Sequence, residues 1–212
     1  MPGAPAPRHP APLSAVLLPP AHRPPAPLPP APLPPAPRLP DPRPLTGEPL
    51  ALDLLNTRWT RGGAVRDLLL DTDGPAVWLA ANGLDGRFTA DATTVRRLLE
   101  AREAIEAAVD GTATEPLDAV LGHGRIRPTL TAEGPGERAE FADPAWGPAW
   151  LAARDCLTLL ATKPDRIRGC AHEACALHFL DTSRNGGRRW CSMATCGNRA
   201  KASRHHARSK EA

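Results

Sequence analysis

Four of the chain's five cysteines fall within one 27-residue span near the C-terminus, and their spacing restricts how that segment can fold. They form two pairs with four residues between the thiols of each pair, and fifteen residues separate the pairs. Paired cysteines at such spacings are typical of structural zinc sites, where thiolates close a tetrahedral shell. We therefore predict a structural Zn²⁺ site with the ligands Cys170, Cys175, Cys191 and Cys196.

Two alternatives to a four-thiolate zinc site remain open at this point. Tetrahedral sulfur ligation also suits iron, although zinc is favoured for a non-redox site in a looped segment. His172 and His178 are close enough in sequence to replace one cysteine. Four thiolates saturate the ion and leave no position for water, so the composition of the shell favours a structural role over a catalytic one.

The charge of the chain is distributed unevenly. The formal net charge is +3, but residues 165–212 carry ten Lys or Arg against four Asp or Glu, a net of +6, which leaves −3 for the remainder. A basic block on a mildly acidic protein predicts a polyanionic partner such as DNA or RNA. The alternative is a solvated tail that only keeps the protein soluble.

The segment that follows the last cysteine is suited to contact such a partner. Residues 197–208 contain no proline and no β-branched residue, so they can form a helix with three cations on one face and almost no apolar stripe. Arginine binds phosphates or guanine edges, and asparagine can pair with adenine. The candidate nucleic-acid contacts are Arg188, Arg189, Asn198, Arg199, Lys201, Arg204 and Arg208. In the alternative, Arg188 and Arg199 pair with carboxylates such as Asp181 and only brace the finger.

The N-terminal part has a composition that opposes folding. Residues 1–44 hold nineteen of the 27 prolines, favour extended polyproline II and lack apolar periodicity, so we predict a disordered leader. A helical domain is expected over 45–163 and the finger over 164–212. No apolar run approaches the ~18 residues of a membrane span, and no signal-peptide core is recognisable. We expect a cytoplasmic protein without membrane contact, whose thiols stay reduced.

The middle of the chain predicts a mainly α fold with one small β-hairpin. Helical spacing of apolar residues, capping residues and terminating glycines or prolines indicate helices near 50–55, 71–81, 90–109, 116–121 and 145–162. Residues 125–142 alternate around Gly134-Pro135-Gly136 and predict a hairpin with Ile126, Leu130 and Phe141 on one face. Cys156 has no second thiol or histidine within helical reach and is expected to be a buried apolar residue.

Catalytic signatures do not emerge from the helical region. It contains no phosphate-binding glycine loop, nucleophile elbow or paired acid and base, so we do not expect an enzyme. Asp53, Asn56 and Thr57 mark either a ligand pocket or, as such residues more often do, the polar end of a helix.

The cysteine segment closely resembles the CGNR-type zinc-finger proteins. The resemblance rests on Cys170 to Cys175, on Phe179 to Asn185, on Arg188 to Met193, and above all on Cys196-Gly197-Asn198-Arg199-Ala200-Lys201. Residues 47–57 look like the opening motif of the ABATE domain that precedes this finger. The resemblance implies a mostly helical ABATE domain, then the finger, and a role as a stress-linked bacterial transcription regulator. The proline-rich leader is not part of that pattern.

Together these observations favour a zinc-dependent nucleic-acid-binding protein, with DNA preferred over RNA as the partner. One alternative is a protein-interaction module that zinc braces, because Trp190, Phe179 and Leu180 put apolar bulk beside the cysteines. Another is a small-molecule sensor in the helical domain. The effector and the oligomeric state, including a homodimer, are left open by the sequence.

Overall fold

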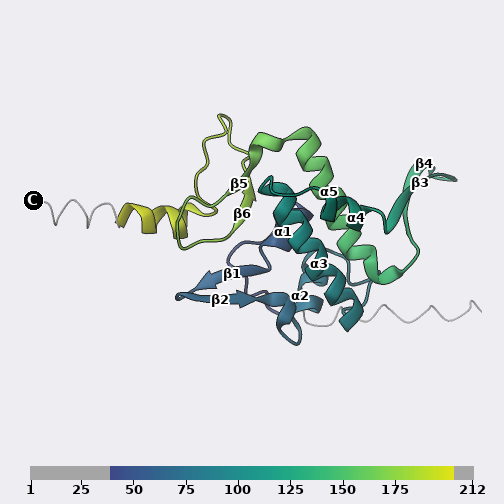
Figure 1. Ribbon diagram of the computed structural model, residues 1–212, viewed down its shortest axis with the longest axis horizontal. Helices are drawn as coiled ribbons and strands as arrows, with labels where there is room; N and C mark the ends of the chain where they lie inside the picture. Colours follow the sequence, from purple (N-terminus) through teal and green to yellow (C-terminus); the bar gives the residue numbers. More distant parts are fainter. Residues whose placement is uncertain (1–38, 203–212) are drawn as a thin grey trace, which may run out of the picture. The chain divides into compact units, whose positions relative to one another are not determined.

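The computed structural model describes residues 39–202, and within them the fold is mainly α-helical with three two-stranded antiparallel sheets (Figure 1). No helix in this range combines the length and the apolarity that a bilayer crossing requires. In chain order the elements are α1 (Leu50–Leu55), β1 (Arg58–Arg61), β2 (Ala64–Asp67), η1 (Leu68–Leu70), α2 (Gly74–Ala81), α3 (Ala92–Val109), α4 (Glu115–Leu121), β3 (Gly124–Thr131), β4 (Gly134–Phe141), η2 (Pro144–Trp146), α5 (Gly147–Thr162), η3 (Pro164–Arg166), β5 (Ile167–Gly169), β6 (His178–Leu180) and η4 (Met193–Gly197).

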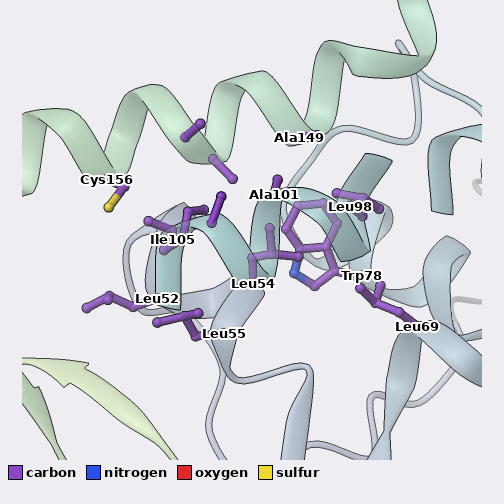
Figure 2. Close-up of a cluster of buried hydrophobic side chains, with 14 of the residues drawn as sticks. Leu52, Leu54, Leu55, Leu69, Trp78, Leu98, Ala101, Ile105, Ala149 and Cys156 are labelled. Carbon is purple, nitrogen blue, oxygen red and sulfur yellow. The ribbon is translucent and has the colours of Figure 1, made fainter. Parts of the chain in front are cut away.

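The hydrophobic core lies where α1, α3 and α5 pack against one another, with Trp78 of α2 beside them (Figure 2). All but one of the six residues of α1 are buried, so this short helix runs through the core rather than over it. Cys156 of α5 is completely buried, and burial, followed by the nearby charge of Asp155, raises the pKa of its thiol to about 12. The prediction that Cys156 is a structural apolar residue is thereby confirmed.

A six-residue helix is unstable alone, and α1 is held by polar contacts from its neighbours. The Ala51 N–H at its first turn donates to Asp155 of α5 at 2.9 Å. Asp53 is buried and accepts hydrogen bonds from Arg43 at 2.6 Å and from Asn82 at 3.0 Å. Arg43 is only 6% exposed, which corrects the predicted start of folded chain at 45: the leader already packs on the domain at Arg43. Most of the predicted leader, residues 1–38, lies outside the described residues.

The predicted helices are present, but the predicted hairpin differs in its turn. Thr131 pairs with Gly134, so the turn is Ala132-Glu133 and the glycines lie within β4. Leu130 is 83% exposed, contrary to the expected apolar face. The β3–β4 hairpin projects from the helices (Figure 1), and only its base packs, where the Phe141 ring lies edge-on to Trp150 at 5.6 Å.

A second hairpin, β1–β2, was not predicted. Gly62 and Gly63 occupy its two-residue turn with φ of +61° and +78°, the left-handed conformation that this turn requires. Its far end is anchored by Asp67, which forms a buried ion pair of 2.6 Å with Arg102 of α3. Trp59 anchors the near end because its side chain is 5% exposed.

Gly74, at the start of α2, is a position where the fold excludes any side chain. A Cβ there would lie 1.6 Å from the backbone oxygen of Leu68, an atom that cannot move without displacing η1. We predict that Gly74→Ala lowers the free energy of unfolding by about 3 kcal/mol, the upper part of the range for overpacking. Urea unfolding followed by circular dichroism measures the change.

The matched control is Gly86→Ala, because a Cβ at Gly86 meets no atom within 4 Å. This variant should change stability by no more than about 0.5 kcal/mol. Equal effects of the two substitutions would contradict the close approach of η1 to α2.

Candidate metal centre and nucleic-acid interface

The four predicted ligands come together in space. Their Sγ atoms all lie within 4.8 Å of one another, with Cys175–Cys191 at 3.8 Å and Cys191–Cys196 at 3.6 Å. A tetrahedral zinc with Zn–S bonds of about 2.3 Å places its sulfurs about 3.8 Å apart. Within residues 39–202, no histidine or carboxylate joins this group. The donor set therefore fits a four-thiolate ion and does not support the mixed shell.

Short backbone turns bring the thiols together. The β5–β6 pairing places Cys170 and Cys175 at the same end of the hairpin, where the Cys170 N–H donates to the Leu177 carbonyl at 2.8 Å. The second pair belongs to a loop that closes through η4, whose first turn is capped by Ser192 accepting from the Thr195 N–H at 3.3 Å. Both pairs thus depend on local hydrogen bonds as well as on any ion.

The thiols influence one another's ionisation. The Cys191 thiol donates to Cys175, which, helped by the Leu177 N–H, lowers the pKa of Cys175 to about 5. The same contact, with burial, raises the pKa of Cys191. Burial raises the pKa of Cys196 to about 11. Four adjacent thiolates repel one another, so the site ionises fully only around a cation.

The two nearby histidines have other surroundings. His172 accepts a hydrogen bond at Nδ1 from the Ala174 N–H at 3.2 Å. Burial lowers the pKa of His178, partly offset by the negative charges of Asp110 and Glu106 on the α3 side. Neither side chain belongs to the thiol group.

The finger is fastened to the helical domain through the outer edge of β6. Asn56, just after α1, donates to the His178 carbonyl at 2.9 Å and accepts from the His178 N–H at 2.8 Å. Glu48, just before α1, accepts from the Leu180 N–H at 2.9 Å. We name these contacts of Glu48 and Asn56 with β6 the α1–β6 clasp. It satisfies the strand edge that β5 leaves open.

The clasp explains the polar residues at the ends of α1. Asn56 and Thr57 are both completely buried, and Thr57 accepts from Arg102 of α3 at 2.9 Å. Asp53 holds Arg43 and Asn82, as described above. These side chains bridge separate elements, so they neither form a ligand pocket nor simply cap a helix. Sequence reasoning had no signal for the partner of Asn56, which lies 122 residues away.

Arg188 is engaged within the protein. Its guanidinium donates to the carbonyl of Cys191 at 2.6 Å and to that of Trp190 at 3.1 Å. It also lies 4.1 Å from the centre of the Phe179 ring and 3.6 Å from a Glu48 carboxylate oxygen. The predicted partner Asp181 is contacted by the Arg188 backbone N–H at 3.0 Å. This geometry matches the bracing alternative for Arg188.

The other basic candidates point to a different part of the surface. Residues 198–202 continue η4 as a helix, and Arg199 and Lys201 on it are exposed, as is Arg189. Within residues 39–202, Arg199 and Lys201 form no ion pair. The Asn198 side chain donates to the Ala194 carbonyl at 3.2 Å. Arg204 and Arg208 lie outside the described residues.

A cavity of about 360 Å³ separates the finger from the β1–β2 hairpin. Arg61 and Trp59 line it from the hairpin, and Arg199 and three of the thiols line it from the finger. The two glycines after Arg61 could have revealed the hairpin in the sequence, but nothing there places it beside the cysteines.

Asn56→Ala should weaken the clasp. The substitution leaves the His178 N–H and carbonyl without their partner, and we expect a loss of about 2 kcal/mol in unfolding free energy. Hydrogen exchange read by mass spectrometry should show faster exchange of the β6 amides.

Asn82→Ala is the matched control, since the Asn82 amide makes two hydrogen bonds of similar length within the helical domain. It should lower stability without selectively exposing β6. If β6 exchanges at the wild-type rate in Asn56→Ala, the clasp does not hold the finger.

Comparison with known proteins agrees with this geometry. The family model described as "CGNR zinc finger" matches residues 166–209, and the ABATE family model, described as "Putative stress-induced transcription regulator", matches residues 48–163. A search of curated proteins found no match. The chain therefore belongs to the ABATE family and carries a CGNR zinc finger directly after its ABATE domain.

Proposed function

We propose that this protein is a zinc-dependent, nucleic-acid-binding transcription regulator of bacteria. The observation that carries the proposal is the direct continuation of the four-thiol site into a short helix with exposed, unpaired cations. A closed thiolate shell fixes the start of that helix, and the cations then meet a polyanion in a defined orientation.

The ion would be zinc, held by Cys170, Cys175, Cys191 and Cys196. Bound there, it compensates the thiolate charge and cross-links two loops that have almost no apolar core between them. Its shell has no free position, which supports a binding function rather than an enzymatic one. The cytoplasm suits such a site because its thiols stay reduced.

The proposed contact surface comprises Arg189, Arg199 and Lys201, and in the sequence it continues to Arg204 and Arg208. Arg188 is assigned a bracing role, because its donors already serve carbonyl groups of the finger. DNA is the preferred partner: a helix enters the major groove of B-DNA, whereas that of an RNA duplex is too narrow. The Asn198 amide would have to leave the Ala194 carbonyl to read a base.

The ABATE domain would supply the regulatory input, by binding an effector that is not identified or by pairing two chains. Its route to the finger is the α1–β6 clasp, which joins the buried helix α1 to the strand between the cysteine pairs. A change in the packing of α1 would therefore be felt at β6.

One observation favours a second function, a zinc-braced protein-interaction module. Met193 of η4 is 51% exposed beside the thiols, and exposed methionines suit adaptable protein contacts. Affinity capture from a lysate with and without nuclease separates the two functions. A partner retained after nuclease treatment supports protein contact, whereas loss of all partners supports nucleic acid.

We predict that the purified chain contains one zinc ion and that Cys170→Ser loses it, because three thiolates and a hydroxyl form a much weaker shell. Elemental analysis by mass spectrometry measures the zinc. Cys156→Ala, which removes a buried thiol outside the site, should retain full zinc. Wild-type protein with less than stoichiometric metal, or with iron in its place, would contradict the assignment.

We predict that the zinc-loaded chain binds random-sequence duplex DNA with an affinity that falls steeply as salt increases. Each phosphate contact contributes about −0.9 to the slope of log K against log salt, so Arg199→Gln and Lys201→Gln should each reduce the slope by about one. Fluorescence anisotropy across a salt series gives these slopes. Absence of binding even at low salt would exclude the proposed function.

A further inference from the structure

The cavity between the β1–β2 hairpin and the finger has a chemical character of its own. Arg61 lines it from one side and Arg199 from the other, and no aspartate or glutamate is among its lining residues within the described part of the chain. An ion held by the thiols accounts for the cysteine-lined part of this space. The remainder is a site of positive charge that nothing in the fold requires.

The positive charges at this cavity are unneutralised. Both guanidinium groups are exposed, and neither forms an ion pair or side-chain hydrogen bond with any residue of 39–202. Arg58, on the same strand as Arg61, differs: it pairs with Glu106 of α3 at 2.6 Å. The hairpin therefore neutralises the arginine that faces the helices and leaves the one that faces the cavity available to an external anion.

The strand register adds a second cation to the same face of the hairpin. Side chains alternate along β1, so Trp59 and Arg61 share a face, and Arg66 stands directly opposite Trp59 on β2. Arg66 is exposed and has no ion pair in the described chain. The turn beyond it is bare glycine backbone: a Cβ at Gly62 or Gly63 would meet no atom within 4 Å. A bulky ligand can approach this face without a steric barrier.

The two walls of the cavity are fixed to the same helix. Asn56 at the end of α1 binds β6 of the finger, and the hairpin begins two residues later at Arg58. Arg102 of α3 binds both ends of the hairpin, through Thr57 at 2.9 Å and through Asp67 at 2.6 Å. The spacing between Arg61 and Arg199 is thus set by folded structure rather than by a loose linker.

We propose that the β1–β2 hairpin is a second nucleic-acid-binding element, and that Arg61 and Arg199 bind one backbone phosphate from opposite walls of the cavity. This inference rests on the proposed function and extends its surface from the finger to the ABATE domain. A phosphodiester fits because guanidinium groups donate in pairs to phosphate oxygens. The contact positions the protein on the strand and carries no sequence preference, while Arg66 serves a neighbouring phosphate.

The test compares the zinc-loaded full chain with Arg61→Gln on random-sequence duplex DNA by fluorescence anisotropy. Loss of one phosphate contact should remove a factor of about 3.5 from the fall in affinity between about 50 and about 200 mM salt. Arg138→Gln is the matched control, since Arg138 is an exposed arginine of the other hairpin without an ion pair in the described chain. Its affinity and slope should equal those of the wild type.

A second measurement distinguishes direct contact from a long-range field. Ala64, opposite Arg61, and Leu130, on the β3–β4 hairpin, are both exposed and can each carry a benzoylphenylalanine cross-linker. Ultraviolet light should cross-link the DNA to position 64 and not to position 130. Cross-links at neither position, or equally at both, would overturn the hairpin contact.

The outcomes separate this inference from the function on which it rests. If the wild type does not bind DNA, the proposed function fails. If the wild type binds and Arg199→Gln weakens binding while Arg61→Gln behaves like Arg138→Gln, the finger binds DNA and the hairpin does not. If Arg61→Gln leaves DNA binding unchanged but abolishes thermal stabilisation by inorganic phosphate, the cavity serves a small anion instead, which also overturns the inference.

Discussion

The outer edge of β6 is the constraint on which the arrangement of this protein depends. The strands of the finger are three residues long, and an unpaired edge of that length between two cysteine pairs would be open to water or to another chain. Glu48 and Asn56 satisfy that edge with side chains from either end of α1. The finger is consequently an extension of the ABATE core and not a bead on a linker.

Arg188 connects the clasp to the metal centre. The same guanidinium donates to the Cys191 carbonyl, stacks on the Phe179 ring and approaches Glu48, so one cation spans the ligand loop, the strand and the domain. An arginine in such a position looks, in a sequence rich in basic residues, like any other phosphate-binding candidate. Only the positions of the carbonyl groups reveal that its donors are already used.

The sequence predicts those features that depend on local chemistry. Cysteine spacing identified the thiol group, and apolar periodicity with capping residues identified the helices, because both signals lie within a few residues of the feature itself. The clasp could not be predicted, since Asn56 and His178 are brought together only by the packing of the whole domain. The β1–β2 strands were missed because four residues rich in arginine give too short an alternation, and the β3–β4 turn was misplaced because its glycines lie beside the turn and not in it.

Energetic coupling between the two parts follows from shared hydrogen bonds. The His178 N–H and carbonyl are satisfied only while β6 and α1 are both in place, so the free energy of each part depends on the other. A ligand that stabilises the finger, whether an ion at the thiols or a polyanion at the arginines, must therefore also stabilise α1, and by reciprocity any effector that repacks α1 alters affinity at the finger. The burial of α1 in the centre of the core gives that coupling its reach, because five of its six residues touch the packing of α3 and α5 rather than solvent.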